Sequence, residues 1–393
     1  MGDKMENLIK NYKQVQEKLK KIVSLEKVKK EEPIGYTTFG FPIEHYSLGE
    51  GKKHIILEAG VHGCEIITVD FLLQLMEEMS NGKDDKKWNT KEYKFHFFPL
   101  MNPEGYIIST SAIQALFPKD ADFMTLEKIC KNYYIKYRQD DLDSKKVMKE
   151  INEIEQEEER MESLALMRRQ LKYYQEIFKE IDYTCIPDEY QELKENVKKI
   201  YEKSKIPKGS LQIWSSNGNG VDLEENCEEN KRYYLTKEEY AKLRYENINI
   251  NQVGPIGCPN KNKKKFELEP ENKAIYQFIQ ELQKQEGTII YISYHSTGGL
   301  IYYRSHCEKQ KKQEFNRKLA LGYQEKTDYT IMEEEKENCN EVIMRNLVDG
   351  HIKIELSPMG GNPIGPYGDI KGNYLPTIQK NIEALKYMLE KIF

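Results

Sequence analysis

A histidine and a glutamate lie three residues apart in the stretch Glu58–Thr68, where a short apolar run meets a helical pattern. His62 and Glu65 supply imidazole and carboxylate, which are the ligand types of catalytic zinc. The run His54–Leu57 predicts a buried strand, and the apolar spacing from Val69 to Met79 predicts a helix. A turn between these elements can aim both side chains at one point. Taken alone, the pair also fits a solvated pair after a strand, because His-x-x-Glu is common on exposed helices.

Two further polar residues stand at the ends of apolar strands predicted later in the chain. His295 follows Thr288–Tyr294, and Glu355 closes a run that begins at His351. Strand-end loops converge at one edge of an open α/β sheet, so these residues can meet the first pair. Two histidines and one glutamate form a zinc set with a fourth position open for water. Alone, His295 fits a hydrogen-bonded core histidine equally well, whereas a carboxylate that closes an apolar strand is costly to bury without a partner.

The elements that would position these residues alternate between strand and helix patterns. Helical spacing recurs at Leu8–Ile22, Pro270–Gln285 and 376–393, and a strand from Tyr93 ends in the turn sequence Asn102–Tyr106. This order predicts an α/β fold with a mixed or mostly parallel sheet and helices on both faces.

A composition change divides the chain from about residue 123 to 205. This segment contains no glycine, is rich in Glu, Lys and Gln, and spaces its apolar residues at helical intervals. It predicts two to four helices with breaks near 140–143 and 185–187. We expect a helical insertion at 123–205 within one catalytic domain that spans residues 1–393.

Composition excludes several other classes. The chain has 393 residues, 38% hydrophobic residues and a formal net charge of −5. Lys and Glu are mixed rather than blocked, which gives a nucleic-acid partner no electrostatic support. No apolar run approaches the roughly 18 residues of a membrane helix, and the N-terminus lacks the apolar core of a signal peptide. Seven scattered cysteines suit reduced thiols, so a cytoplasmic location is expected; the oligomeric state is left open.

Six short pieces in a fixed order give the chain a family resemblance. They are Ala59–Glu65, Asn102–Tyr106, Gly220–Leu223, Glu269–Glu271, Tyr294–Ser296 and Ile354–Leu356. Together they resemble the carboxypeptidase A-like zinc peptidases, and the bacterial branch that acts on γ-D-glutamyl-diaminopimelate peptides is the nearest.

The resemblance implies a fold and a set of roles. It implies a twisted, mixed eight-stranded sheet flanked by helices, and a Zn²⁺ cofactor. His62, Glu65 and His295 match the family's zinc ligands, and Glu355 matches its general base. The implied partner is a peptide or a cell-wall-type peptide.

One part of the pattern departs from the family. The family usually continues Gly-Val-Asp-Leu with Asn-Arg-Asn, which grips the substrate carboxylate, whereas this chain has Glu224, Glu225 and Asn226. The upstream arginine has no counterpart in Asn217–Gly220. Tyr329 is a loose match for the family's tyrosine near the substrate.

The charge reversal at Glu224 and Glu225 bears on the substrate. It predicts a cationic or diamino-acid group on the substrate, because a substrate carboxylate would meet like charge there. The alternative is that these carboxylates face solvent or pair with Lys231 or Arg232.

Two other function classes stay open at this stage. One is an aspartoacylase-like amidase that cleaves N-acyl amino acids and shares the His-x-x-Glu and the distant histidine. The other is a non-catalytic protein of the same fold that binds a partner through the helical insertion.

Overall fold

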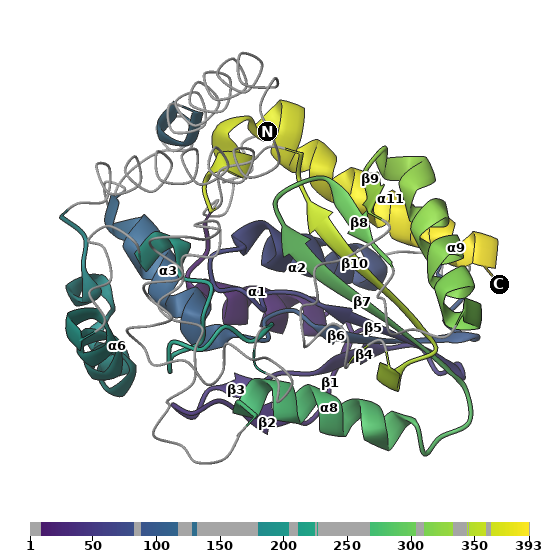
Figure 1. The fold of residues 1–393 in the computed structure, drawn as a ribbon, viewed down its shortest axis with the longest axis horizontal. Helices are drawn as coiled ribbons and strands as arrows, with labels where there is room; N and C mark the ends of the chain where they lie inside the picture. Colours follow the sequence, from purple (N-terminus) through teal and green to yellow (C-terminus); the bar gives the residue numbers. More distant parts are fainter. Residues whose placement is uncertain are drawn as a thin grey trace, which may run out of the picture.

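An eight-stranded mixed sheet forms the centre of the molecule (Figure 1). The computed structural model describes residues 9–81, 88–116, 128–131, 180–203, 211–224, 226, 268–303, 310–332, 344, 346–358 and 363–392. The strand order is β1-β4-β6-β5-β7-β10-β8-β9, and β2 and β3 form a separate antiparallel pair. The strands are β1 (Lys29–Lys30), β2 (Gly35–Tyr36), β3 (Pro42–Ile43), β4 (Tyr46–Leu48), β5 (Lys53–Glu58), β6 (Tyr93–Phe98), β7 (Thr288–Ser296), β8 (Leu300–Tyr302), β9 (Thr330–Met332) and β10 (Gly350–Leu356).

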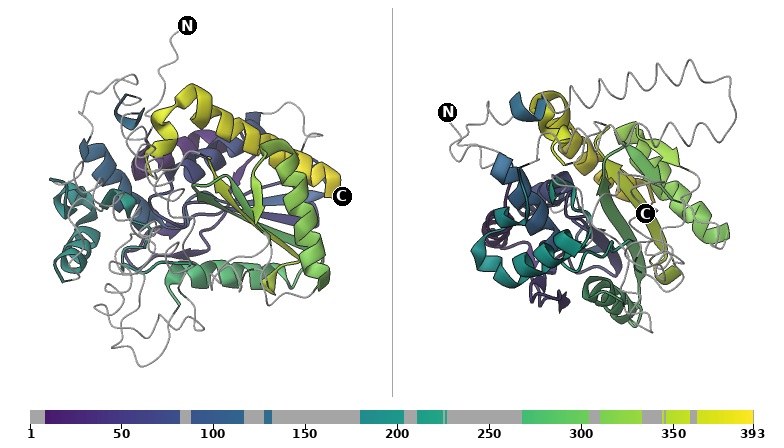
Figure 2. Two further views of the ribbon diagram at one scale, coloured as in Figure 1. Left: turned by 45° about the horizontal axis from the view of Figure 1, so that its top comes forward. Right: turned by 60° about the vertical axis from the view of Figure 1, so that its left-hand side comes forward.

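Helices cover both faces of this sheet (Figure 2). They are α1 (Tyr12–Val23), α2 (Ile66–Asn81), α3 (Pro103–Leu116), α6 (Gln191–Lys203), α8 (Pro270–Leu282), α9 (Gln310–Thr327) and α11 (Leu375–Ile392). One hydrophobic cluster joins the sheet to α1, α2, α9 and α11, and a second joins the opposite face to α8. The expected fold class, a mixed eight-stranded sheet flanked by helices, is therefore confirmed.

The four central strands are parallel, and their side chains alternate between the two clusters. In β5, Ile55 and Leu57 join the cluster under α2, whereas Ile56 between them joins the cluster under α8. Such strands are buried on both faces and are therefore apolar almost throughout. His96 and Lys353 are polar exceptions within strands, whereas His295 and Glu355 lie at strand ends and mark the edge at which the site is built.

The predicted turn at Asn102–Tyr106 is instead the start of a helix, α3. Asn102 accepts a hydrogen bond from the backbone N–H of Gly105 at 2.8 Å, and Pro103 occupies the first helical position. An asparagine cap followed by proline is a helix-start signal. The prediction was wrong because these residue types serve turns and helix starts alike.

Part of the predicted helical insertion lies among the described residues. Within this part, short 3₁₀ turns at Tyr183–Cys185 and Asp188–Tyr190 precede α6, which agrees with the break predicted near residue 186. Buried α6 residues Leu193 and Val197 pack with Ile107 and Ile108 of α3 in a third hydrophobic cluster. The rest of the predicted insertion lies mainly outside the described residues, so its boundaries stay a prediction.

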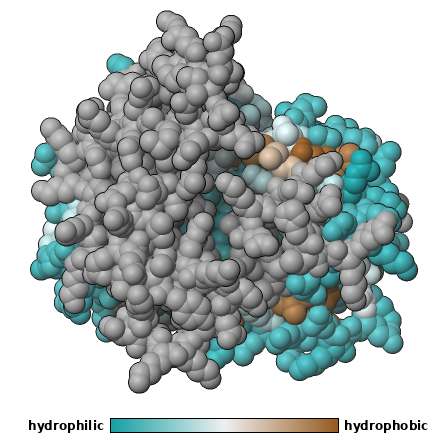
Figure 3. Space-filling view, in the orientation of Figure 1, coloured by the Kyte–Doolittle hydropathy of each residue, from teal (hydrophilic) through white to brown (hydrophobic). Residues whose placement is uncertain are grey.

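The described surface gives no sign of a bilayer-spanning element. Among the described residues, no helix is both long and apolar enough to cross a membrane. On the face drawn in Figure 3, the described residues are mainly hydrophilic, with small hydrophobic areas between them.

Candidate metal and active site

The turn between β5 and α2 is held in shape by one threonine. Thr68 donates its hydroxyl hydrogen to the carbonyl of Glu65 at 2.7 Å, and the same hydroxyl accepts the N–H of Gly60 at 3.1 Å. Gly60 has φ +65°, a backbone conformation that side chains other than glycine rarely adopt. This local geometry places His62 and Glu65 on the same side of the turn.

Close packing against α3 fixes the position of the turn. A Cβ at Gly63 would lie 2.1 Å from the carbonyl carbon of Gly105, so the two backbones touch directly. The Asn102 amide donates to the carbonyl of Val61 at 2.9 Å and to that of Ser216 at 3.0 Å. One side chain therefore ties the turn, the start of α3 and the segment before residue 217 together.

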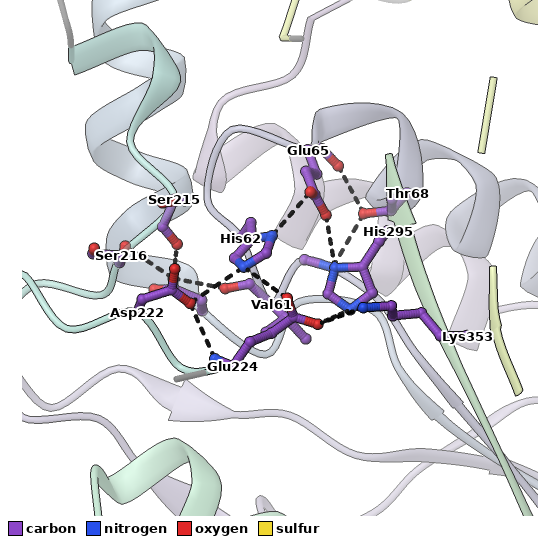
Figure 4. A network of polar contacts seen from close by, with 12 residues as sticks. Val61, His62, Glu65, Thr68, Ser215, Ser216, Asp222, Glu224, His295 and Lys353 are labelled. Atoms are coloured by element: carbon purple, nitrogen blue, oxygen red, sulfur yellow. Dashed lines mark hydrogen bonds and ion pairs between the residues drawn. The ribbon is translucent and has the colours of Figure 1, made fainter. Parts of the chain in front are cut away.

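The structure brings the three predicted ligand residues together (Figure 4). Glu65 lies between the two imidazoles, with Oε1 2.9 Å from His62 Nδ1 and Oε2 3.1 Å from His295 Nδ1. The His62 and His295 ring centroids are 5.1 Å apart, and all three residues are buried. Residues that are 230 positions apart in sequence thus share one set of contacts.

Two further carboxylates face the opposite nitrogens of the same rings. His62 Nε2 lies 3.3 Å from Asp222 Oδ1 and 3.5 Å from Glu224 Oε2. His295 Nε2 lies 3.2 Å from Glu224 Oε1. The sequence reasoning did not assign a role to Asp222, although it lies inside the Gly220–Leu223 piece of the family resemblance.

The neighbouring carboxylates raise the pKa values of the His62 and His295 imidazoles. Burial alone would lower the pKa of His62, but Glu65, Asp222 and Glu224 raise it well above its ordinary value. Burial likewise opposes protonation of His295, yet Glu224 and Glu65 raise its pKa to about 9. Burial would raise the pKa of Glu65, and the two imidazoles instead lower it to about 2.

Glu355 and Lys353 project from β10 on one face of the sheet. Glu355 pairs in register with His295 on β7, and its side chain is partly exposed. Burial, and then Glu65, raise the pKa of Glu355 to about 7, while His295 and Lys353 act in the opposite direction. The Lys353 ammonium lies 3.4 Å from Glu224 Oε1, and both side chains are 4% exposed.

The remaining residues predicted for substrate binding occupy different settings. Asn226 is fully buried, and its Oδ1 accepts the backbone N–H of Glu269 at 2.8 Å. The Tyr329 hydroxyl accepts hydrogen bonds from the Asn381 amide at 2.9 Å and from the backbone N–H of Ser357 at 3.3 Å. Glu225 lies outside the described residues. Their roles in substrate binding stay predictions.

The donor set fits a zinc ion. Zinc is bound by neutral imidazole nitrogen and carboxylate oxygen, and each Glu65 oxygen lies beside one imidazole Nδ1. A zinc-binding histidine usually donates its other ring N–H to a carboxylate, as Asp222 and Glu224 allow here. Ligand atoms of His62, Glu224 and His295 also lie within 4.8 Å of one another, so Glu224 offers a second carboxylate to the same imidazoles.

Solved structures share this fold. The thrombin-activatable fibrinolysis inhibitor is 14% identical with a TM-score of 0.54, and the match covers 97% of this chain and 72% of that one. Carboxypeptidase A from Helicoverpa armigera is 12% identical with a TM-score of 0.52, covering 98% and 73%. At these identities the likeness concerns the fold. A comparison with curated proteins finds no match.

The family is shown by the sequence itself. A family model described as zinc carboxypeptidase matches residues 8–344, which is most of the chain and includes the strands and turns that carry His62, Glu65 and His295. The chain therefore belongs to the zinc carboxypeptidase family and is a zinc-dependent metallopeptidase.

Proposed function

We propose that the chain hydrolyses a peptide bond with zinc held by His62, Glu65 and His295 and with Glu355 as general base. The main support is that each Glu65 oxygen contacts the Nδ1 atom of one histidine. The Nε2 atoms of the same histidines face Asp222 and Glu224. Zinc in such a set supplies Lewis acidity to the scissile carbonyl and makes water acidic enough to deprotonate near neutral pH.

In this proposal Glu355 moves the proton. It takes the proton of the attacking water and gives it to the amine nitrogen of the leaving group. Its pKa of about 7, raised first by burial and then by Glu65, suits a group that must accept and release a proton near neutrality. Its position beside His295 in register keeps it next to the ligand set.

For the substrate, the proposal is a cationic or diamino-acid group near the scissile bond, as in diaminopimelate, lysine or arginine. Acidic charge around the ligands supports it: among the described residues of the site, the carboxylates of Glu65, Asp222, Glu224 and Glu355 outnumber the positive charges of a bound Zn²⁺ and the Lys353 ammonium together. A substrate carboxylate would meet net negative charge in such a site, whereas a cation would be attracted.

Matched histidine variants test the ligand set. His295→Gln should lower zinc content and hydrolysis together, because it removes one of three protein ligands. His54→Gln changes a buried histidine of the same sheet that lies outside the ligand set, and it should keep its zinc. The zinc content of both variants is measured by metal analysis after dialysis against a weak chelator. Full zinc content in His295→Gln would refute the ligand assignment.

A substrate panel tests the reaction. The panel contains γ-D-glutamyl-diaminopimelate peptides, peptides ending in Lys or Arg, peptides ending in apolar residues, and N-acyl amino acids. The proposal expects peptide hydrolysis with higher kcat/KM for the cationic members. Preferential cleavage of N-acyl amino acids would favour an aspartoacylase-like amidase. No hydrolysis by the zinc-loaded chain would favour a binding protein.

The Glu225→Gln variant tests the proposed preference for cationic peptides. With zinc saturating, Glu225→Gln should raise KM for cationic peptides by up to about tenfold and leave KM for neutral peptides unchanged. Equal kinetics for cationic and neutral peptides in the parent chain would end the proposed preference and leave zinc-dependent hydrolysis intact.

A further inference from the structure

Two carboxylates compete geometrically for the same pair of imidazoles. Glu65 contacts the Nδ1 atoms of His62 and His295 at 2.9 and 3.1 Å. Glu224 contacts their Nε2 atoms at 3.5 and 3.2 Å (Figure 4). Either glutamate, together with the two histidines, would complete a set of two imidazoles and one carboxylate. The ligand atoms of His62, Glu224 and His295 lie within 4.8 Å of one another, so distance alone does not keep a metal ion away from the Glu224 side of the rings.

Charge distinguishes the two sides. Lys353 Nζ lies 3.4 Å from Glu224 Oε1, and both side chains are almost fully buried. A dication bound at that oxygen would lie a few ångströms from the ammonium, and burial strengthens the repulsion because water screens it poorly.

We propose that Lys353 is a positioning residue that keeps Glu224 a hydrogen-bond acceptor and prevents it from becoming a metal ligand. Glu224, with Asp222, then takes the Nε2–H of the imidazoles, which leaves the two Nδ1 lone pairs to face Glu65. Lys353 thereby selects one of two possible metal positions. This inference rests on the proposed zinc function and adds the residue that decides where the ion is held.

The position of Lys353 on β10 explains how its ammonium is held beside Glu224. Lys353 is two residues from Glu355, so both side chains leave the strand on the same face. Its ammonium also lies 5.1 Å from the centre of the Tyr302 ring on β8, the strand that pairs with β10 at this register. The Tyr302 ring thus flanks the ammonium that lies beside Glu224.

Zinc affinity in a double variant tests the selection. We would measure zinc dissociation constants by competition with a chromophoric chelator in the full chain, after circular dichroism has confirmed folding. Glu65→Gln should lose at least a hundredfold in affinity, and Glu224→Gln between ten- and a hundredfold, as for residues that orient a ligand. Adding Lys353→Met to Glu65→Gln should regain at least tenfold, because Glu224 is then released to bind the ion.

A charge-preserving control separates electrostatics from packing. Lys353→Arg in the Glu65→Gln background keeps the positive charge and should regain nothing. Lys353→Gln should regain affinity like Lys353→Met, and it replaces that variant if the methionine chain does not fold. The absorption spectrum of the cobalt-loaded double variant should differ from that of the parent, because the ligand set has changed sides.

The outcomes distinguish the zinc ligand set from the role of Lys353. Full zinc affinity in Glu65→Gln would refute the ligand set of the proposed function. Loss in Glu65→Gln without recovery on removing the charge of Lys353 would overturn the selection alone. Recovery with arginine equal to that with methionine or glutamine would overturn it as well, because charge would then not be the cause.

Discussion

Three buried histidines form a row across the sheet, and acid should destabilise the protein through them. His96 of β6 lies at the centre, with Nδ1 3.0 Å from His45 Nε2 and Nε2 3.0 Å from His54 Nδ1. Burial, and then His45 and His54, lower the pKa of His96 to about 2. His96 therefore stays neutral in the folded chain over the pH range in which an unfolded histidine takes up its proton.

The size of the effect follows from proton linkage. An unfolded histidine has a pKa near 6.5, so its proton is bound below that pH only in the unfolded chain. The stability contributed by a neutral His96 is fully present above about pH 6.5 and is lost as the pH falls from there toward the folded pKa. At pH 5, which is about 1.5 units below 6.5, one such histidine costs about 2 kcal/mol of unfolding free energy.

His96→Gln removes this titration and keeps a side chain that can donate and accept. We expect the variant to be less stable than the parent at pH 8, and the difference to shrink by about 2 kcal/mol or more at pH 5. The reason is that only the parent loses the His96 contribution. Comparing variant with parent cancels the titrations of His62 and His295, whose raised pKa values act in the opposite direction.

Urea unfolding of the metal-free proteins at both pH values is the assay. Phe97→Leu is the control, since it changes a fully buried side chain of the same strand without a titratable group. Its cost should be the same at pH 8 and pH 5. A His96→Gln cost that is equally independent of pH would refute the argument, because a neutral buried row cannot then be what acid disturbs.

The other predictions concern the site. Glu355→Gln should keep fold and zinc and lose at least about a hundredfold in kcat, with loss of the acidic limb of the pH–rate profile. Asp222→Asn should weaken zinc binding about ten- to a hundredfold, because His62 loses the charged acceptor at its Nε2. Gly63→Ala should cost about 3 kcal/mol or more and reduce zinc content, since the new Cβ would overlap the Gly105 backbone.

Each of these predictions has a result that would contradict it. Parental turnover in Glu355→Gln would remove that residue from the base role. Unchanged zinc affinity in Asp222→Asn would mean that the ring of His62 is held by other contacts. Gly322→Ala is the control for the glycine, because a Cβ there meets α11 at an ordinary 3.4 Å, and equal costs at both glycines would contradict the packing argument.

Local sequence determined the elements that carry the site. The apolar run of β5 and the helical spacing of α2 are both patterns within a few residues, so the sequence alone predicted a strand and a helix there. His62 and Glu65 were therefore predicted to lie on the turn between them. The ends of apolar strands likewise indicated His295 and Glu355. These two lie side by side since β7 and β10 are parallel neighbours in register.

Only the tertiary structure decided what surrounds those residues. The contact between Gly63 and Gly105, the bridge made by Asn102, and the placing of Glu224 against Lys353 join segments that are distant in sequence. No local pattern encodes such contacts, because they depend on which strands become neighbours and on how closely the backbones pack. The partner of Glu224 is a lysine 129 residues away that reads in the sequence as an ordinary polar position of a strand. The fold buries both side chains and thereby places the Lys353 ammonium beside the proposed metal ligands.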